Sequence, residues 1–169
     1  MKTIGIVSED PIARTMDVAD PVGLLMGIVP STNPTSTAIF KSIIAIKARN
    51  GIVFSPHPSA AKCTLKAATL MRDAAVEAGA PENIIGCISM PSMPATDELM
   101  HSKEVKMIIA TGGPGMVKAS YSAGKPALGV GAGNSPAYIE RTANVQQAVT
   151  NIIASKTFDY GTICASEQS

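Results

Sequence analysis

The chain has 169 residues, of which 46% are hydrophobic, 16% charged and 4% aromatic, and its formal net charge is +1. A chain of this length can form one domain with a hydrophobic core. The high hydrophobic and low charged content excludes an intrinsically disordered chain. A charge so close to zero gives no basic field for nucleic acid, and the longest apolar run, Val22 to Val29, is too short to cross a bilayer. We therefore expect neither a nucleic acid nor a membrane as partner.

Along the chain, short apolar runs alternate with longer segments of helical periodicity. The expected strands are 2–7, 15–19, 22–29, 51–54, 84–89, 107–110 and 127–130, and the expected helices are 35–49, 59–78, 95–101, 115–123 and 145–156. The first two strands predict a hairpin within residues 1–20. Thr35 or Ser36 is the expected cap of the first helix, which carries Ile39, Ile43 and Ile46 along one face.

Strands separated by helices of this length predict βαβ units with right-handed crossovers. The fold class is therefore α/β, with a Rossmann-like, mostly parallel sheet and helices on both faces. Cys63, Cys87 and Cys164 are odd in number, widely spaced and without a Cys-x-x-Cys pair. They indicate cytosolic thiols and a cytoplasmic protein, and they disfavour a zinc site.

Two glycine-rich turns each follow an expected strand. Thr111-Gly112-Gly113-Pro114-Gly115 precedes a helix, where backbone N–H groups and the helix dipole can hold a pyrophosphate. Gly129-Val130-Gly131-Ala132-Gly133 is the second cluster. Either one alone is as well explained as a tight turn. Two of them at strand ends of one sheet favour nucleotide binding, because ligands collect at that edge.

Two polar residues are candidates for chemistry. Asn33 stands in a proline-bounded loop after a buried strand, where it is either a simple turn residue or a preorganised donor to an oxyanion. Cys164 follows Gly161 among polar neighbours, unlike Cys63 and Cys87, which read as small apolar residues. Neither histidine is obviously placed to act as its base, so a Cys-His protease is the weaker interpretation.

Together these segments resemble the coenzyme A-acylating branch of the aldehyde dehydrogenase superfamily, and within it the aldehyde dehydrogenase half of bifunctional aldehyde–alcohol dehydrogenases. The segments that carry the resemblance, in family order, are 29–37 (VPSTNPTST), 54–58 (FSPHP), 110–115 (ATGGPG), 129–136 (GVGAGNSP) and 157–169 (TFDYGTICASEQS). They span nearly the whole chain.

The resemblance implies Cys164 as the nucleophile that attacks an aldehyde, with Asn33 and the Cys164 N–H as the oxyanion hole. It implies that hydride then passes to NAD⁺ and that coenzyme A cleaves the resulting thioester, with a short-chain, acetaldehyde-like substrate. The residues implied to contact the cofactor are Pro30, Ser31, Thr32, Ser55, Pro56, His57, Pro58, Thr111, Gly112, Gly113, Pro114, Gly115, Val130 and Gly131.

Departures from the hydrolysing aldehyde dehydrogenases favour the acylating branch. Those enzymes carry a glutamate beside the second glycine cluster to activate water, and Val130-Gly131-Ala132-Gly133 has no carboxylate. A thiol is already a good nucleophile and has no need of that base. Pro58 stands near the place of a second family glutamate, which binds the cofactor ribose, so the choice between NAD and NADP stays open.

The family's chain starts before Met1 and continues past Ser169 into a catalytic domain and an oligomerising arm. By resemblance, residues 1–156 are then the cofactor-binding domain and residues 157–169 the nucleophile segment. Two alternatives to an active acylating dehydrogenase stay open. One is a nucleotide-binding module without turnover. The other is a piece of a larger assembly, since relatives form homo-oligomers.

Overall fold

The computed structural model describes residues 2–168, which form two compact units, residues 2–130 and residues 131–168. The first unit contains a β-hairpin and the main sheet with its helices. The second contains one long helix and two short strands.

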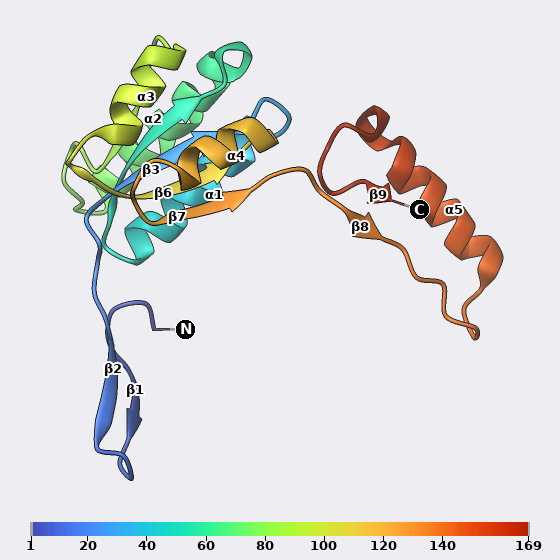
Figure 1. Ribbon diagram of the computed structural model, residues 1–169, viewed down its shortest axis with the longest axis horizontal. Helices are drawn as coiled ribbons and strands as arrows, with labels where there is room; N and C mark the ends of the chain where they lie inside the picture. Colours follow the sequence, from blue (N-terminus) through green and yellow to red (C-terminus); the bar gives the residue numbers. More distant parts are fainter. Residues whose placement is uncertain (1, 169) are drawn as a thin grey trace. The chain divides into compact units, whose positions relative to one another are not determined.

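The main sheet has five parallel strands in the order β5-β4-β3-β6-β7 (Figure 1). Their bounds are β3 (Leu24–Val29), β4 (Gly51–Pro56), β5 (Ile85–Cys87), β6 (Val105–Thr111) and β7 (Ala127–Val130). The central strand β3 is buried from Leu25 to Val29, as its unbroken apolar sequence predicts. The expected α/β class with a parallel sheet is thereby confirmed.

The central strand starts two residues later than expected. The Oδ1 atom of Asn50 accepts hydrogen bonds from the N–H groups of Val22 and Gly23, at 2.7 and 2.9 Å. Gly23 has φ of +114°, a left-handed backbone that a strand does not use. The backbone donors at 22 and 23 therefore bond to a side chain, and the ladder begins at Leu24.

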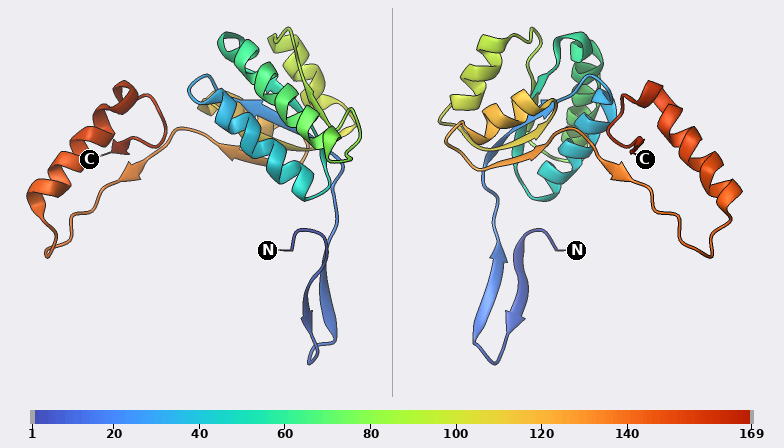
Figure 2. Two further views of the ribbon diagram at one scale, coloured as in Figure 1. Left: turned by 180° about the vertical axis from the view of Figure 1, so that it is seen from behind. Right: turned by 45° about the vertical axis from the view of Figure 1, so that its right-hand side comes forward.

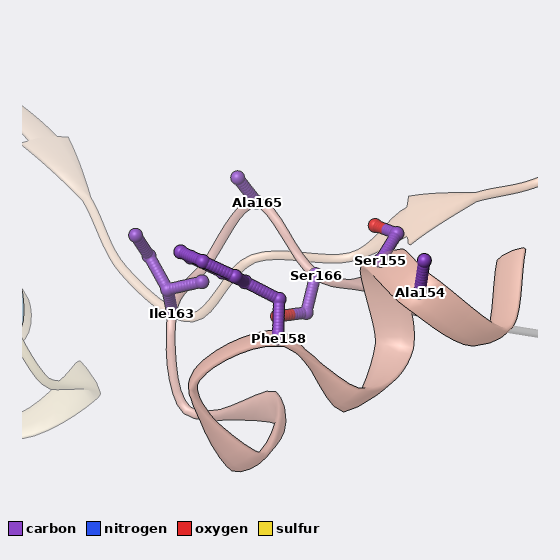
Figure 3. A pocket seen from close by; sticks show the side chains of 6 residues that line it. All are labelled: Ala154, Ser155, Phe158, Ile163, Ala165 and Ser166. Carbon is purple, nitrogen blue, oxygen red and sulfur yellow. The ribbon is translucent and has the colours of Figure 1, made fainter. Parts of the chain in front are cut away.

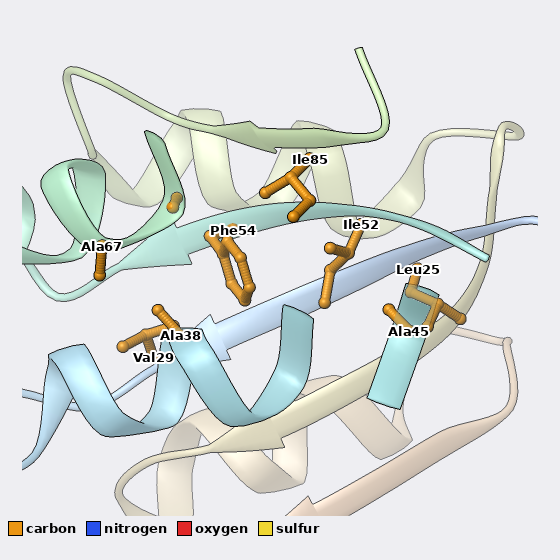
Figure 4. Packing of buried hydrophobic residues seen from close by; sticks show 9 residues of the cluster. Leu25, Val29, Ala38, Ala45, Ile52, Phe54, Ala67 and Ile85 are labelled. Atoms are coloured by element: carbon orange, nitrogen blue, oxygen red, sulfur yellow. The ribbon is translucent and has the colours of Figure 1, made fainter. Parts of the chain in front are cut away.

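Helices cover both faces of the sheet (Figures 1 and 2). α1 (Pro34–Lys47) and α2 (Ala61–Glu77), the latter preceded by the 3₁₀ turn η1 (Pro58–Ala60), pack on the core of Leu25, Val29, Ile52 and Phe54 shown in Figure 4. α3 (Met93–His101) and α4 (Pro114–Tyr121) belong to the opposite face, where the core residues are Met26, Ile28, Met100, Val105, Ile108, Ala110 and Ala123.

The packing face of α1 differs from the expected one. Ile46 packs against the core as expected, but Ile39 and Ile43 are 39% and 51% exposed. The residues that α1 buries are Thr37, Ala38, Lys41, Ser42 and Ala45. Small side chains at this spacing let the helix axis approach the sheet closely, which outweighs the larger apolar area of the isoleucines. The expected cap at Thr35 or Ser36 is also wrong, because Asn33 occupies the cap position and Pro34 is the first helical residue.

The hairpin expected near the N-terminus is present. β1 (Gly5–Asp10) and β2 (Thr15–Ala19) pair antiparallel, with a bulge between Ile6 and Ser8. Asp10 Oδ1 accepts from the N–H groups of Ile12 and Ala13, both at 2.9 Å, and so shapes the turn. The hairpin forms a sheet of its own.

In the second unit, β8 (Ser135–Pro136) pairs in parallel with β9 (Glu167–Gln168), and α5 (Val145–Thr157) runs into the 3₁₀ segment η2 (Phe158–Gly161). The side chain of Asn144 caps α5 by accepting from Gln147 N–H at 3.0 Å. The two short strands were not expected from the sequence. Across residues 2–168, no helix has the length and apolar character needed to cross a membrane.

Candidate active site

The carboxyl ends of the parallel strands bring the expected site residues of the first unit to one edge of the sheet. Pro30 to Asn33 follow β3, His57 follows β4 and Gly112 follows β6. The chain order reverses between β3 and β6, which is the point where α/β sheets open a crevice for ligands. His57 N–H donates to Val29 O at 3.1 Å, so the first two loops are joined directly.

Asn33 is held by its backbone, which leaves its side-chain amide available. Its carbonyl oxygen accepts from Thr37 N–H at 3.2 Å and from the Thr37 hydroxyl at 2.8 Å. Its side chain makes no capping bond to α1, and Oδ1 accepts from Thr32 Oγ1 at 3.3 Å. Within the part of the chain that the structure describes, the amide nitrogen has no partner. The backbone of Asn33 is thus fixed at a strand end, and the N–H groups of its side-chain amide are available as donors.

The turn after β6 leads into the N-terminus of α4. Gly113 is the cap residue and Pro114 the first helical residue, and Gly112 N–H donates to Val130 O at 3.2 Å. A Cβ added at Gly113 or Gly115 would meet nothing within 4 Å, and neither residue has a positive φ. Because the chain's own packing demands no glycine there, the bare backbone suits the close approach of a ligand.

In the second glycine cluster, Gly129 is required by the packing of a strand against a helix. A Cβ at Gly129 would lie 2.6 Å from Val117 Cγ1 and 2.9 Å from the ring of Tyr121, so Gly129 lets β7 contact α4. Val130 ends the first unit with its side chain exposed, and Gly131 begins the second. Their expected contact with a cofactor stays a prediction.

The segment after β4 is ordered by side-chain hydrogen bonds. The Ser55 hydroxyl is buried and lies 2.8 Å from Thr96 Oγ1 of α3, so its hydrogen bond goes to the protein. His57 is exposed, and its Nδ1 lies 2.7 Å from Ser59 Oγ and accepts from Ser59 N–H at 3.3 Å. The bond from Ser59 N–H makes the His57 side chain the cap of the 3₁₀ turn that leads into α2.

The helices α1, α2 and α4 all begin at this edge. The positive end of each helix dipole therefore favours an anion here. The segments 30–33, 57–60 and 112–115 contain no carboxylate. The edge therefore suits a diphosphate. No group of three or more His, Cys, Asp or Glu side chains that could hold a metal ion occurs among residues 2–168.

Cys164 lies in the second unit, on a turn closed by the hydrogen bond from Ser166 N–H to Ile163 O at 3.0 Å. Its side chain is exposed. The chain reaches this turn through Asp159 and Tyr160, which both have positive φ, at 50° and 53°. A non-glycine backbone in this region is strained, and such strain is concentrated at functional sites.

Gly133 packs against the backbone of Cys164. A Cβ at position 133 would lie 1.9 Å from the Cys164 carbonyl oxygen and 2.8 Å from its Cα. Only a glycine permits this approach, and β8 and β9 pair just beyond it. The second glycine cluster thus supports the turn that carries the thiol.

A pocket of about 340 Å³ lies beside the thiol-bearing turn (Figure 3). It is lined by Ala154, Ser155, Phe158, Ile163, Ala165 and Ser166. The lining is mainly apolar. The hydroxyl of Ser166 is buried and, in the described chain, has no hydrogen-bond partner. Cys164 itself is not a lining residue, although its sequence neighbours Ile163 and Ala165 are.

The remaining cysteines and His101 show no sign of catalysis. Cys63 lies in α2 and donates to Ala60 O at 3.2 Å, and burial raises the pKa of the Cys87 thiol in β5 to about 11. His101 ends α3, where Nδ1 lies 3.0 Å from the Asp97 carbonyl oxygen and 3.3 Å from its carboxylate. Cys164 and Asn33 belong to different units, and their meeting in one site stays a prediction.

Sequence reasoning missed Lys41 and Thr96. Lys41 is 2% exposed, and its Nζ donates to Ile28 O at 2.6 Å and to Ile109 O at 2.8 Å. The sequence does contain a signal for the burial of Lys41, because its spacing from Ala38 and Ala45 places all three on one face of the helix. Thr96 bonds Ser55 across 41 residues, for which no local pattern exists.

Comparison with known proteins gives agreement along the whole chain. The sequence profile of the aldehyde dehydrogenase family matches residues 2–169. The bifunctional aldehyde-alcohol dehydrogenase of Escherichia coli K12 is 57% identical over 168 residues, which are 99% of this chain and 19% of that protein.

Solved structures agree as well. An acetylating aldehyde dehydrogenase from Geobacillus thermoglucosidasius superposes with a TM-score of 0.91 and 63% identity, covering 98% of this chain and 37% of that one. A propionaldehyde dehydrogenase from Rhodopseudomonas palustris, solved with bound propionyl-CoA, gives 0.81 and 40%, covering 88% and 33%. The chain thus spans between 19% and 37% of the length of these proteins.

Proposed function

Because the chain belongs to the aldehyde dehydrogenase family, we propose that it carries the cofactor-binding part and the nucleophile of an acylating aldehyde dehydrogenase. The reaction converts a short-chain aldehyde, NAD⁺ and coenzyme A to acyl-CoA and NADH. The observation that carries the proposal is the match of nearly the whole chain to acetylating enzymes at up to 63% identity. The second glycine cluster, which has no carboxylate to activate water, supports the same branch.

The sheet edge fits the cofactor. Backbone N–H groups of the turn at Gly112–Gly115 and the N-termini of α1 and α4 would hold its diphosphate, with His57 and Pro58 toward the adenosine. When bound, NAD⁺ supplies the hydride acceptor. The boundary between a cofactor-binding domain and the nucleophile segment at residues 156 and 157 is part of the same proposal.

Cys164 is the proposed nucleophile. Its thiolate sulfur bonds to the aldehyde carbon, and the negative charge that develops on the aldehyde oxygen is held by the Asn33 amide and the Cys164 N–H. With NAD⁺ bound as hydride acceptor, the tetrahedral carbon would lose its hydride and leave an acyl thioester on Cys164. The thiol of coenzyme A then takes the acyl group, and its proton restores the free cysteine thiol. The apolar pocket lined by the sequence neighbours of Cys164 is consistent with a small aliphatic aldehyde, and the propionyl-CoA in the Rhodopseudomonas structure supports coenzyme A as acyl acceptor.

We also propose that the protein is cytoplasmic and forms homo-oligomers. A second candidate function, nucleotide binding without turnover, is favoured by one observation. The strand ends that suit a diphosphate lie in the first unit and Cys164 lies in the second, so the nucleotide site does not depend on the thiol.

NADH formation from acetaldehyde and NAD⁺, with and without coenzyme A, tests the proposal. We expect turnover that requires coenzyme A and disappears in Cys164→Ala, whereas the matched control Cys63→Ala keeps it. Turnover without coenzyme A would show hydrolysis and refute the acylating assignment. No turnover together with saturable NAD⁺ binding would establish the second candidate.

A further inference from the structure

A lysine is buried in the middle of α1 and bonds to two strands of the sheet. The Nζ atom of Lys41 donates to Ile28 O of β3 at 2.6 Å and to Ile109 O of β6 at 2.8 Å. The side chain is fully buried, with Lys41 only 2% exposed. Lysine is almost never fully buried unless its nitrogen is paired, so this placement needs an explanation.

The two carbonyl groups lie close to the point where β3 and β6 stop pairing and their chains separate. We call this point the fork of the sheet. The register of β3 with β6 ends at the pair of Ile28 and Ala110. Beyond it β3 leads into the loop with Asn33, and β6 leads into the turn at Gly112–Gly115. Lys41 thus joins the two strands where their own ladder stops.

The surroundings of Lys41 contain no counter-ion. α1, β3, β4 and β6 carry no carboxylate, and their other charged side chains are Lys47 and Lys106. The carboxylates of α2, Asp73 and Glu77, are exposed near the end of that helix. Two acceptors match the two N–H groups of a neutral amine, and burial lowers the pKa of Lys41 to about 7.

We propose that Lys41 is a positioning residue that closes the fork between β3 and β6 and thereby sets the spacing between the Asn33 loop and the Gly112–Gly115 turn. The side chain acts through backbone carbonyl groups and touches neither substrate nor cofactor. The functional meaning of this spacing rests on the proposed function, because those loops are the proposed oxyanion and diphosphate sites. The spacing itself is a property of the chain.

The rest of the helix stripe fits this role. Ala38, Ser42 and Ala45 are small and let α1 lie close enough for the lysine to reach the strand ends. The Ser42 hydroxyl donates to Ala38 O at 2.8 Å, within its own helix. Ser42 is therefore a matched control, since it is equally buried and hydrogen-bonded but is not bonded to either strand.

Amide hydrogen exchange tests the proposal on Lys41→Met, which keeps the length of the side chain and removes the donors. The amides to follow are those of Thr37 and Val117, which donate to Asn33 O and Gly113 O. We expect exchange at both to become at least tenfold faster, with changes below threefold in Ser42→Ala and in the exposed-site control Lys47→Met. A folded Lys41→Met protein with unchanged exchange at both positions would overturn the proposal.

A second measurement needs no variant and decides the matter if Lys41→Met does not fold. The Lys41 Cε carbon signal and the Cα carbon signals of Asn33 and Gly113 are followed together by NMR over the titration of Lys41. A shared midpoint supports the positioning role, and loop signals that stay constant while Lys41 titrates refute it.

Cofactor affinity separates this proposal from the proposed function. NAD⁺ should bind at least fivefold more weakly to Lys41→Met than to either control. If the unaltered chain binds no NAD⁺, the proposed function fails, while the exchange and titration results still decide whether Lys41 sets the loop spacing. If Lys41→Met binds NAD⁺ like the controls, the positioning role has no effect on the site and the proposal fails.

Discussion

Replacing Gly133 by alanine should displace the nucleophile. A Cβ at this position lies 1.9 Å from the Cys164 carbonyl oxygen, and real Cβ atoms essentially never come closer than 3.0 Å, so the two segments must separate by about 1.1 Å. The obstacle is backbone on both sides, which no rotamer change relieves. A misplacement of about 1 Å near a reacting group costs on the order of 10²-fold in rate.

Two assays measure the effect. The rate of NADH formation should fall on the order of 10²-fold in Gly133→Ala. Alkylation of Cys164 by iodoacetamide, followed by mass spectrometry, reports on the thiol even without turnover, and the exposed Cys63 in the first unit serves as internal standard. We expect the ratio of the two alkylation rates to change at least threefold.

The control for Gly133→Ala is Gly51→Ala, in which the new Cβ meets its nearest neighbour at an ordinary 3.5 Å. This variant should leave both assays unchanged. If Gly133→Ala keeps both the turnover and the alkylation ratio of the unaltered chain, the contact of Gly133 with Cys164 does not position the thiol, and the reasoning is refuted.

Three further predictions concern the first unit. Gly27→Ala should lower the free energy of unfolding in urea by about 1–3 kcal/mol, because its Cβ would lie 2.7 Å from the buried Phe54 ring; adding Phe54→Leu should recover part of that loss, and strictly additive costs would contradict the contact. Cys87 should react with iodoacetamide far more slowly than Cys63, because burial raises its pKa to about 11, and equal rates would count against that burial. Lys41 has a pKa of about 7 in the folded chain against 10.5 when exposed, so between those values the unfolded chain binds the additional proton and stability rises with pH. The rise, up to about 1.4 kcal/mol per pH unit, should be missing in Lys41→Met, and parallel stability–pH curves for the two proteins would refute it.

The sheet could be predicted from the sequence, and much of the site's position with it. An unbroken apolar run predicted the buried central strand, and the loops after successive strands placed Asn33 and Gly112–Gly115 at one edge. These features are local, because periodicity and turn residues determine them over a few neighbouring positions.

Features that depend on distant partners were not predictable. Ile39 and Ile43 have the larger apolar area, yet Ala38 and Ala45 are the buried residues, because close approach depends on the shape of the facing surface. Lys41 is buried only because two carbonyl groups from distant strands converge on its nitrogen. β8 and β9 are two residues long, so their pairing leaves no periodic trace.

The order of strands in the sheet has a consequence for synthesis on the ribosome. β3, at the centre, is also the first strand of the sheet to be translated. β4 and then β5 join one of its edges, and β6 and then β7 join the other, so each new strand meets an edge that already exists. No strand has to be inserted between two earlier ones. The sheet can therefore grow outward as the chain emerges, and its last strand is complete before the segment that bears Cys164 has been made.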